Sequence, residues 1–171
     1  MAQPIRILGV DPGLNRCGWG VAELNGARLS HVSHGVIKTD PKHALCARLK
    51  LVFEGLRDVA LAHTPTIAAV EETFINTNPR AALALGQARG AALAALAIAG
   101  LSVDEISATE VKKALTGTGR AEKDQVSAMV RRLLPAAGPV TADAADALAV
   151  AICAAHRSTA PASRLTEMMT R

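Results

Sequence analysis

Cysteine is scarce in this chain: only Cys17, Cys46 and Cys153 occur among 171 residues. The number is odd and no pair has a CxxC spacing, which argues against both a disulfide framework and a zinc knuckle as the basis of the fold. We therefore expect three reduced thiols and a cytoplasmic location.

Long, strongly hydrophobic runs are also missing. The first apolar run ends at Asp11 and follows no basic region, so we expect no secretory signal. The longest apolar region, 81–101, is built mainly from alanine and contains Gln87 and Arg89. A membrane-spanning helix is therefore not expected.

Length and composition predict one folded domain. A chain of 171 residues that is 50% hydrophobic and 20% charged can bury a single core. We assign residues 1–157 to this domain, and residues 158–171, which are polar and rich in Ser and Thr, to a flexible C-terminal tail. The net charge of +4 and the pI near 9.3 favour a polyanionic partner.

The first part of the chain predicts three antiparallel strands. The apolar, β-branched run over 5–11 ends at Pro-Gly, which is typical of a buried central strand. Asn25 and Gly26 favour a tight turn between strands over 18–24 and 28–38.

A helical crossover follows these strands. Apolar residues recur at three- and four-residue steps over 44–63 and predict an amphipathic helix, which Pro65 ends. The apolar run over 67–71 should then pair in parallel with the first strand.

The second half is mainly helical. Helices are expected over 80–100, 109–115 and 121–134, with a short strand over 103–106, a linker over 135–139 and a last helix over 142–156 with Thr141 as its N-cap. Gly86 and Gly90 lie on one helix face, so a close packing partner is expected there, either the sheet of this chain or a second copy. The fold class is α/β, with a mixed five-stranded sheet flanked by helices.

Two acids stand where the predicted parallel strands end. Asp11 closes the first strand and Glu71 closes the strand over 67–71. Because ligands bind at the carboxyl ends of strands in open α/β sheets, the two carboxylates should meet at one edge. Glu72 should point to the opposite face of the sheet, because side chains alternate along a strand. The alternatives are a turn-forming Asp before Pro-Gly and a solvated strand end.

Asp143 and Asp146 are three residues apart in the last predicted helix, so both can face one point. Acids in a first helical turn also complement the helix dipole, which is the alternative explanation, mainly for Asp143. Four converging carboxylates repel one another and need cations. Oxygen ligands without His or Cys suit Mg²⁺ or Mn²⁺, and two such ions suit the hydrolysis of phosphodiesters.

Five ordered sequence blocks lie between Ile7 and His156. They are GVDPGLNRCGWG at 9–20, AVEETF at 69–74, LGQARG at 85–90, RAEKDQV at 120–126 and DAADALAVAI at 143–152. Together these blocks resemble one family, the RuvC-type Holliday junction resolvases. The resemblance implies a ribonuclease H-like nuclease domain. It also implies a crossover junction endonuclease that acts in recombination and DNA repair.

The resemblance assigns four metal-binding, catalytic acids to Asp11, Glu71, Asp143 and Asp146. It implies that Asp11 bridges two Mg²⁺ ions, with Mn²⁺ as a substitute, that Glu71 and Asp146 complete the shells, and that Asp143 ligates or orients the attacking water. Hydrolysis would leave 5′-phosphate and 3′-hydroxyl ends.

The resemblance also implies partners. Family members act as homodimers that nick four-way junction DNA symmetrically, so a homodimer and a branch-migration motor of the RuvA/RuvB type are expected. Trp19 stands where the family usually has tyrosine, and Glu72 where an amide is common.

DNA contacts are expected around the proposed acids. Phe74 follows the second strand and is one of three aromatic residues, so it is a candidate for stacking on an unpaired base, although a core role is the alternative. The candidates for phosphate contacts surround a glycine-containing loop, and a solvated helix face is their alternative; they are Lys112, Lys113, Arg120 and Lys123.

Two other functions fit parts of the pattern. A strand followed by Asp-x-Gly also holds phosphate in actin-like and sugar-kinase-like phosphotransferases, but no second phosphate loop is present in the 171 residues. A non-catalytic junction-binding module would keep the fold without the chemistry, and the presence of all four acids argues against it.

Overall fold

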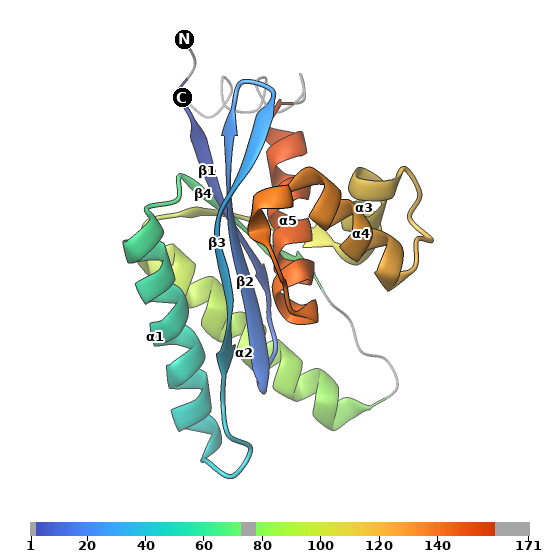
Figure 1. The fold of residues 1–171 in the computed structure, drawn as a ribbon. Helices are drawn as coiled ribbons and strands as arrows, with labels where there is room; N and C mark the ends of the chain where they lie inside the picture. Colours follow the sequence, from blue (N-terminus) through green and yellow to red (C-terminus); the bar gives the residue numbers. More distant parts are fainter. Residues whose placement is uncertain (1–2, 73–77, 160–171) are drawn as a thin grey trace, which may run out of the picture.

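Five strands form one mixed sheet in the order β3-β2-β1-β4-β5 (Figure 1). The computed structural model describes residues 3–72 and 78–159. The strands are β1 (Ile5–Asp11), β2 (Arg16–Asn25), β3 (Arg28–Lys38), β4 (Ile67–Glu72) and β5 (Ser102–Ser107). β1, β2 and β3 pair antiparallel, whereas β4 lies parallel to β1 and β5 parallel to β4. The predicted mixed five-stranded sheet is confirmed.

Helices cover both faces of this sheet (Figure 1). α1 (Leu45–His63) and α2 (Pro79–Ile98) lie on one face, and α5 (Ala142–Thr159) lies on the other with α3 (Ala108–Thr116), α4 (Lys123–Leu133) and the short 3-10 helix η1 (Pro135–Ala137). All predicted elements are present, with ends shifted by up to three residues. The predicted linker contains η1, and α5 runs to Thr159, past the expected end of the domain.

Strand alternation in β1 separates two apolar cores. Ile7 packs in the core that contains α5, whereas Leu8 and Val10 pack in the core that contains α1 and α2. In β4, Ala69 belongs to the α5 side and Val70 to the other. Gly9 and then Asp11 follow Ile7 on the α5 side of β1, and Glu71 follows Ala69 on the α5 side of β4, so an acid lies on this side near the end of each strand.

α5 lies close to the sheet because three glycines, Gly9, Gly18 and Gly20, face it. A Cβ atom added to Gly9 would lie within 3.0 Å of the carbonyl oxygen of Ala147, and one added to Gly18 within 3.0 Å of that of Asp143. Any larger side chain would push the helix outward. These glycines therefore set how near α5 brings its acids to the ends of the strands.

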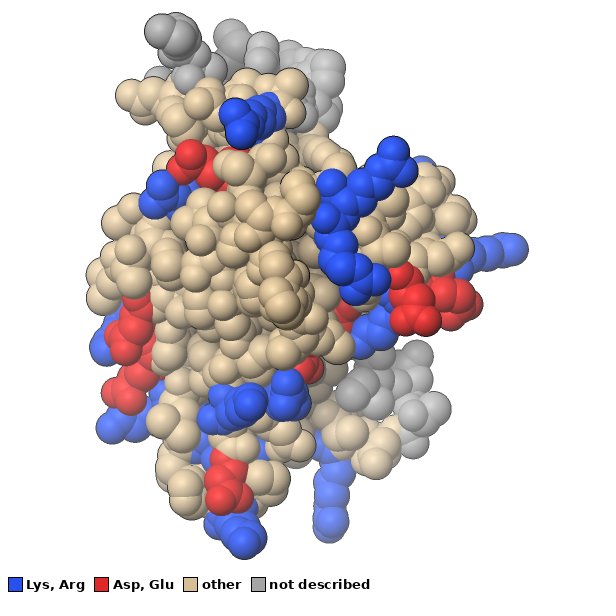
Figure 2. All heavy atoms as spheres, viewed as in Figure 1, with Lys and Arg blue, Asp and Glu red and all other residues tan. Residues whose placement is uncertain are grey.

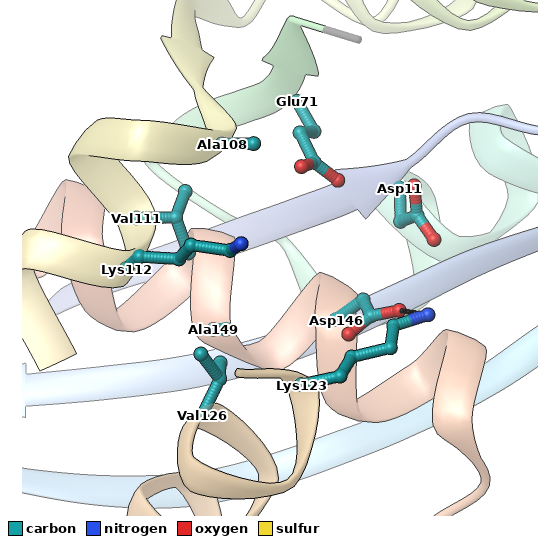
Figure 3. Close-up of a pocket in the computed structure, with 9 residues that line it drawn as sticks. All are labelled: Asp11, Glu71, Ala108, Val111, Lys112, Lys123, Val126, Asp146 and Ala149. Atoms are coloured by element: carbon teal, nitrogen blue, oxygen red, sulfur yellow. Dashed lines mark ion pairs between the residues drawn. The ribbon is translucent and has the colours of Figure 1, made fainter. Parts of the chain in front are cut away.

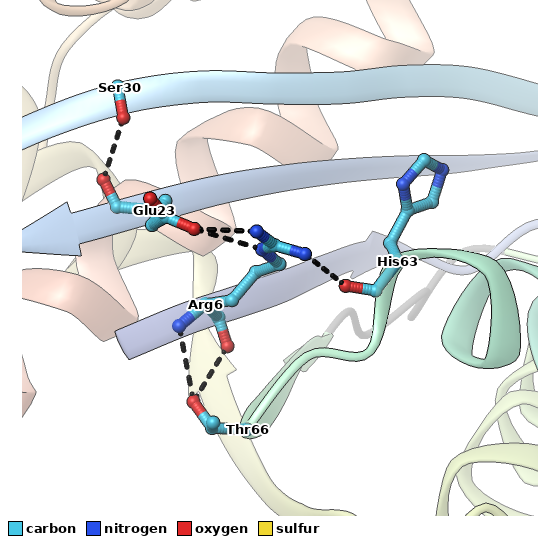
Figure 4. Close-up of polar contacts among 5 residues, drawn as sticks. All are labelled: Arg6, Glu23, Ser30, His63 and Thr66. Carbon is cyan, nitrogen blue, oxygen red and sulfur yellow. Dashed lines mark hydrogen bonds and ion pairs between the residues drawn. The ribbon is translucent and has the colours of Figure 1, made fainter. Parts of the chain in front are cut away.

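Arg6 ties the start of β1 to its neighbours (Figure 4). Its guanidinium donates hydrogen bonds to Glu23 on β2 at 3.1 and 2.7 Å and to the carbonyl oxygen of His63 at the end of α1 at 2.8 Å. The backbone N–H of Thr66 donates to the Arg6 carbonyl oxygen at 2.8 Å. These bonds fix where β4 begins beside β1, at the end of the sheet opposite Asp11.

α2 has an open apolar surface. Leu83 and Ile98 are 63% and 69% exposed. Among the residues that the structure describes, a Cβ added to Gly86 or Gly90 would meet no atom within 4 Å, so the predicted alternative of close packing on the chain's own sheet is wrong. By length and composition α2, with 20 residues and a mean hydropathy of 1.5, is the one helix in the described residues that could cross a membrane. Core helices of soluble proteins meet the same criterion, so this is weak evidence.

The three cysteines are free thiols, as expected. Burial raises the pKa of Cys17 to about 12 and that of Cys153 to about 11. Both thiols therefore stay protonated and unreactive near neutral pH.

Candidate active site

A cavity of about 250 Å³ opens where β1 and β4 end, against α3, α4 and α5 (Figure 3). Three acids and two lysines line it, with an apolar wall of alanine and valine side chains. The lining residues are Asp11, Glu71, Ala108, Val111, Lys112, Lys123, Val126, Asp146 and Ala149. Residues from five separate segments of the sequence thus meet at one edge of the sheet.

The register of two parallel strands places Asp11 beside Glu71. Val10 pairs with Val70, and the two acids follow directly on β1 and β4. In Figure 3 both carboxyl groups lie at the cavity. Glu72 does not line it, as strand alternation predicts.

Asp146 reaches the same cavity from α5. Its side chain is 18% exposed, and its Oδ2 lies 2.8 Å from Nζ of Lys123, the first residue of α4. Lys123 therefore lines the site next to Asp146 and contributes a positive charge beside the acids. This contact raises the pKa of Lys123, so the side chain remains charged at neutral pH.

Asp143 has a different neighbour. Its Oδ2 accepts a hydrogen bond of 2.6 Å from Nε of Arg16, at the start of β2, and it does not line the cavity. The expectation that four carboxylates meet is thus met by three, with the fourth one helical turn away. Sequence reasoning did not single out Arg16, although it lies in the block that contains Asp11.

The buried carboxylates destabilise one another's charged forms. Burial, and then the negative charges of Glu71 and Asp146, raise the pKa of Asp11 to about 8. Burial also raises the pKa of Glu71, although hydrogen bonding with Asp11 opposes this shift. At neutral pH Asp11 is therefore mostly protonated when no cation is bound.

This set of donors fits a hard divalent cation. The acids offer only oxygen atoms, and a bound cation would offset both the burial and the repulsion that raise the pKa of Asp11. Within the described residues, no group of three or more His, Cys, Asp or Glu side chains is arranged to hold a metal ion as it stands. Asp143 and Asp146 are each paired with a basic side chain, Arg16 and Lys123.

Comparison with known proteins identifies the family. The family model for crossover junction endodeoxyribonuclease RuvC matches residues 7–154. This chain belongs to that family. RuvC of Hyphomonas neptunium is 58% identical over 156 residues, covering 91% of this chain and 93% of the relative. RuvC of Rhodospirillum rubrum is 55% identical over 152 residues, covering 89% and 90%.

Solved structures agree with this assignment. The structure of Thermus thermophilus RuvC in complex with a Holliday junction substrate matches with a TM-score of 0.84 at 33% identity, covering 90% of this chain and 94% of that one. The yeast mitochondrial Holliday junction resolvase Ydc2 matches with a TM-score of 0.65 at 13% identity, covering 88% and 79%, which shows the fold alone. The predicted ribonuclease H-like fold is confirmed.

The structure separates the residues expected to contact DNA. Lys112 and Lys123 line the cavity, whereas Lys113 and Arg120 do not and are exposed. Phe74 lies outside the described residues. In Figure 2 basic and acidic side chains alternate on the visible face instead of forming one continuous basic surface.

The two departures from the RuvC pattern lie away from the cavity. Trp19 packs in the apolar core on the α1 and α2 side, and its ring lies 5.7 Å from that of His63. Glu72 is absent from the residues that line the site. Neither departure therefore changes the group of Asp11, Glu71 and Asp146.

Proposed function

We propose that this chain resolves four-way (Holliday) DNA junctions by metal-dependent hydrolysis of phosphodiesters, in recombination and DNA repair. The observation that carries the proposal is the convergence of Asp11, Glu71 and Asp146 in one cavity with two lysines. Its membership of the crossover junction endodeoxyribonuclease family supports the same reaction.

Asp11, Glu71 and Asp146 would hold two Mg²⁺ ions, with Mn²⁺ as a substitute, and Asp143 would join them after leaving Arg16. When bound, the ions would activate water and stabilise the charge that develops on the phosphate oxygens. Water attacks phosphorus and the bond to the 3′ oxygen breaks, which leaves 5′-phosphate and 3′-hydroxyl ends.

The basic residues of the site would orient the DNA backbone. Lys112 faces the cavity from α3, where its ammonium group can bind a phosphate next to the one that is cut. Lys113 and Arg120 are exposed and would contact phosphates farther along the strand. We retain Phe74 as a candidate for stacking on an unpaired base at the junction.

We further propose that the protein acts as a homodimer in the cytoplasm. Paired, symmetric nicks need two active sites related by a twofold axis. The open face of α2 is our candidate for the dimer contact, because Leu83 is exposed and a Cβ added to Gly86 or Gly90 meets no described residue within 4 Å. A branch-migration motor of the RuvA/RuvB type remains the expected partner, and residues 1–157 the nuclease domain.

Cleavage of a synthetic four-way junction, beside linear duplex of the same sequence, tests the function. We expect Mg²⁺-dependent paired nicks in the junction alone. Asp11→Asn should lower the rate by about 10³-fold or more, because metal ions contribute several kcal/mol to such reactions. Glu72→Gln is the matched control and should keep most of the activity. Junction binding without cleavage in Mg²⁺ or Mn²⁺ would instead favour the non-catalytic binding module.

A further inference from the structure

Each acid that α5 contributes is held by a cation from another element. Lys123 of α4 lies 2.8 Å from Asp146, and Arg16 of β2 lies 2.6 Å from Asp143. Figure 3 shows the lysine side chain reaching across to the carboxylate. A lysine or arginine paired with a carboxylate occupies one of its acceptor sites and repels an incoming metal ion, so it weakens metal binding by that carboxylate. Two of the four expected ligands are therefore engaged.

The two members of the Lys123–Asp146 pair differ in mobility. The lysine side chain is 73% exposed and sits on a flexible stem, whereas the aspartate is 18% exposed on a helix packed against the sheet. Exposed ion pairs are weak, so the ammonium group can change partner readily. The carboxylate stays in place when the lysine leaves.

DNA offers both cations another partner. The duplex carries one negative charge per about 1.7 Å of axis, so a strand that enters the cavity brings several phosphates close to Lys123 and Arg16. If Lys123 or Arg16 moves from its carboxylate to a phosphate, its charge stays paired. The carboxylate that it leaves is then free to bind a metal ion.

We propose that Lys123 and Arg16 limit metal binding by Asp146 and Asp143 until DNA is bound. DNA phosphates then draw the lysine and arginine side chains away from the two carboxylates. The inference rests on the proposed metal-dependent nuclease. DNA binding and metal binding then promote each other, and the complete metal site assembles mainly on bound substrate.

The first test measures Mn²⁺ affinity without DNA by titration calorimetry. Lys123→Met frees Asp146 and should tighten Mn²⁺ binding by about 5-fold or more, the lower end of ordinary coupling between sites. Lys112→Met is the matched control because it removes the same charge from the same cavity, while the described ion pair of Asp146 is with Lys123. Lys112→Met should tighten Mn²⁺ binding clearly less than Lys123→Met does.

Two further variants keep this test informative. Lys123→Arg retains the charge and the reach, so it should bind Mn²⁺ as weakly as wild type. Arg16→Gln should tighten binding through Asp143. An equal gain from Lys112→Met and Lys123→Met would mean that the overall charge of the site acts, and would overturn the proposal. An unchanged affinity in a folded Lys123→Met protein would overturn it as well.

The second test measures the coupling itself. Junction affinity is compared in Ca²⁺ and in EDTA. If metal and DNA binding are coupled, each must change the affinity for the other by the same factor. Wild type should bind the junction more tightly in Ca²⁺, and Lys123→Met should lose much of that gain. If Lys123→Met kept the whole gain in junction affinity from Ca²⁺, the coupling would come from phosphate oxygens that bind the metal directly. That result would overturn the proposal. Neither test requires cleavage, so the inference can fail while the nuclease function stands, or the reverse.

Discussion

At the scale of single residues, Asp11 is the acid whose surroundings most disfavour a charged carboxylate. Its folded-state pKa of about 8 is well above the unfolded value near 3.9. Between these two values the folded state binds more protons than the unfolded state, so the free energy of unfolding falls as pH rises. The metal-free protein should therefore lose stability from about pH 4 to about pH 8.

Asp11→Asn should remove most of this pH dependence. We expect the metal-free variant to exceed wild type in free energy of unfolding at pH 8 by at least about 1 kcal/mol, since one pKa unit corresponds to about 1.4 kcal/mol. Urea unfolding in EDTA between pH 5 and pH 9 measures it. Glu72→Gln is the control and should follow wild type. An Asp11→Asn curve parallel to wild type would contradict the raised pKa assigned to Asp11.

The contacts of single residues also limit what sequence can predict. Asp11, Glu71 and Asp146 were found because strand ends and helical spacing are local patterns. The bond between Arg16 and Asp143 joins residues 127 positions apart, and no periodicity predicts which cation reaches which acid. Lys123 was identified as a phosphate contact, but its ion pair with Asp146 depends on how α4 packs against α5.

At the scale of elements, the position of α5 depends on glycine. Gly9→Ala would put a Cβ within 3.0 Å of the Ala147 carbonyl oxygen, so the helix must shift. We expect a loss of about 1 to 3 kcal/mol in the free energy of unfolding, as for other overpacked sites. Chemical denaturation measures it.

Gly86→Ala is the matched control for this substitution. Its Cβ meets no atom within 4 Å in the described residues and replaces a helical glycine, so stability should stay the same or rise by up to about 1 kcal/mol. If both substitutions lower the free energy of unfolding equally, Gly9 is not required for the close packing of α5 on the sheet.

The open face of α2 is the proposed dimer contact, and a single substitution can test it. Gly90→Glu should weaken the proposed dimer without unfolding the monomer, because the position is exposed and has space. Ala128→Glu, on the exposed side of α4, should leave the dimer intact. Analytical ultracentrifugation compares them. A Gly90→Glu protein that remains dimeric places the contact elsewhere.

At the scale of the whole molecule, the pairing of the first four strands was predictable, whereas the place of β5 and the fit between layers were not. The Asn25-Gly26 turn and the helical crossover define which strands pair and in which direction. The sequence also showed that Gly86 and Gly90 share a face, but not what that face contacts. That depends on the position of α2 against the sheet, which no local pattern encodes.

The central claim is that carboxylates from β1, β4 and α5 form one metal site. Anomalous diffraction from crystals grown with Mn²⁺ tests it most directly. We predict a peak within about 2 to 2.5 Å of an Asp11 carboxylate oxygen, shared with Glu71 or Asp146. Strong Mn²⁺ peaks elsewhere, with none beside Asp11 at saturating Mn²⁺, would contradict the account.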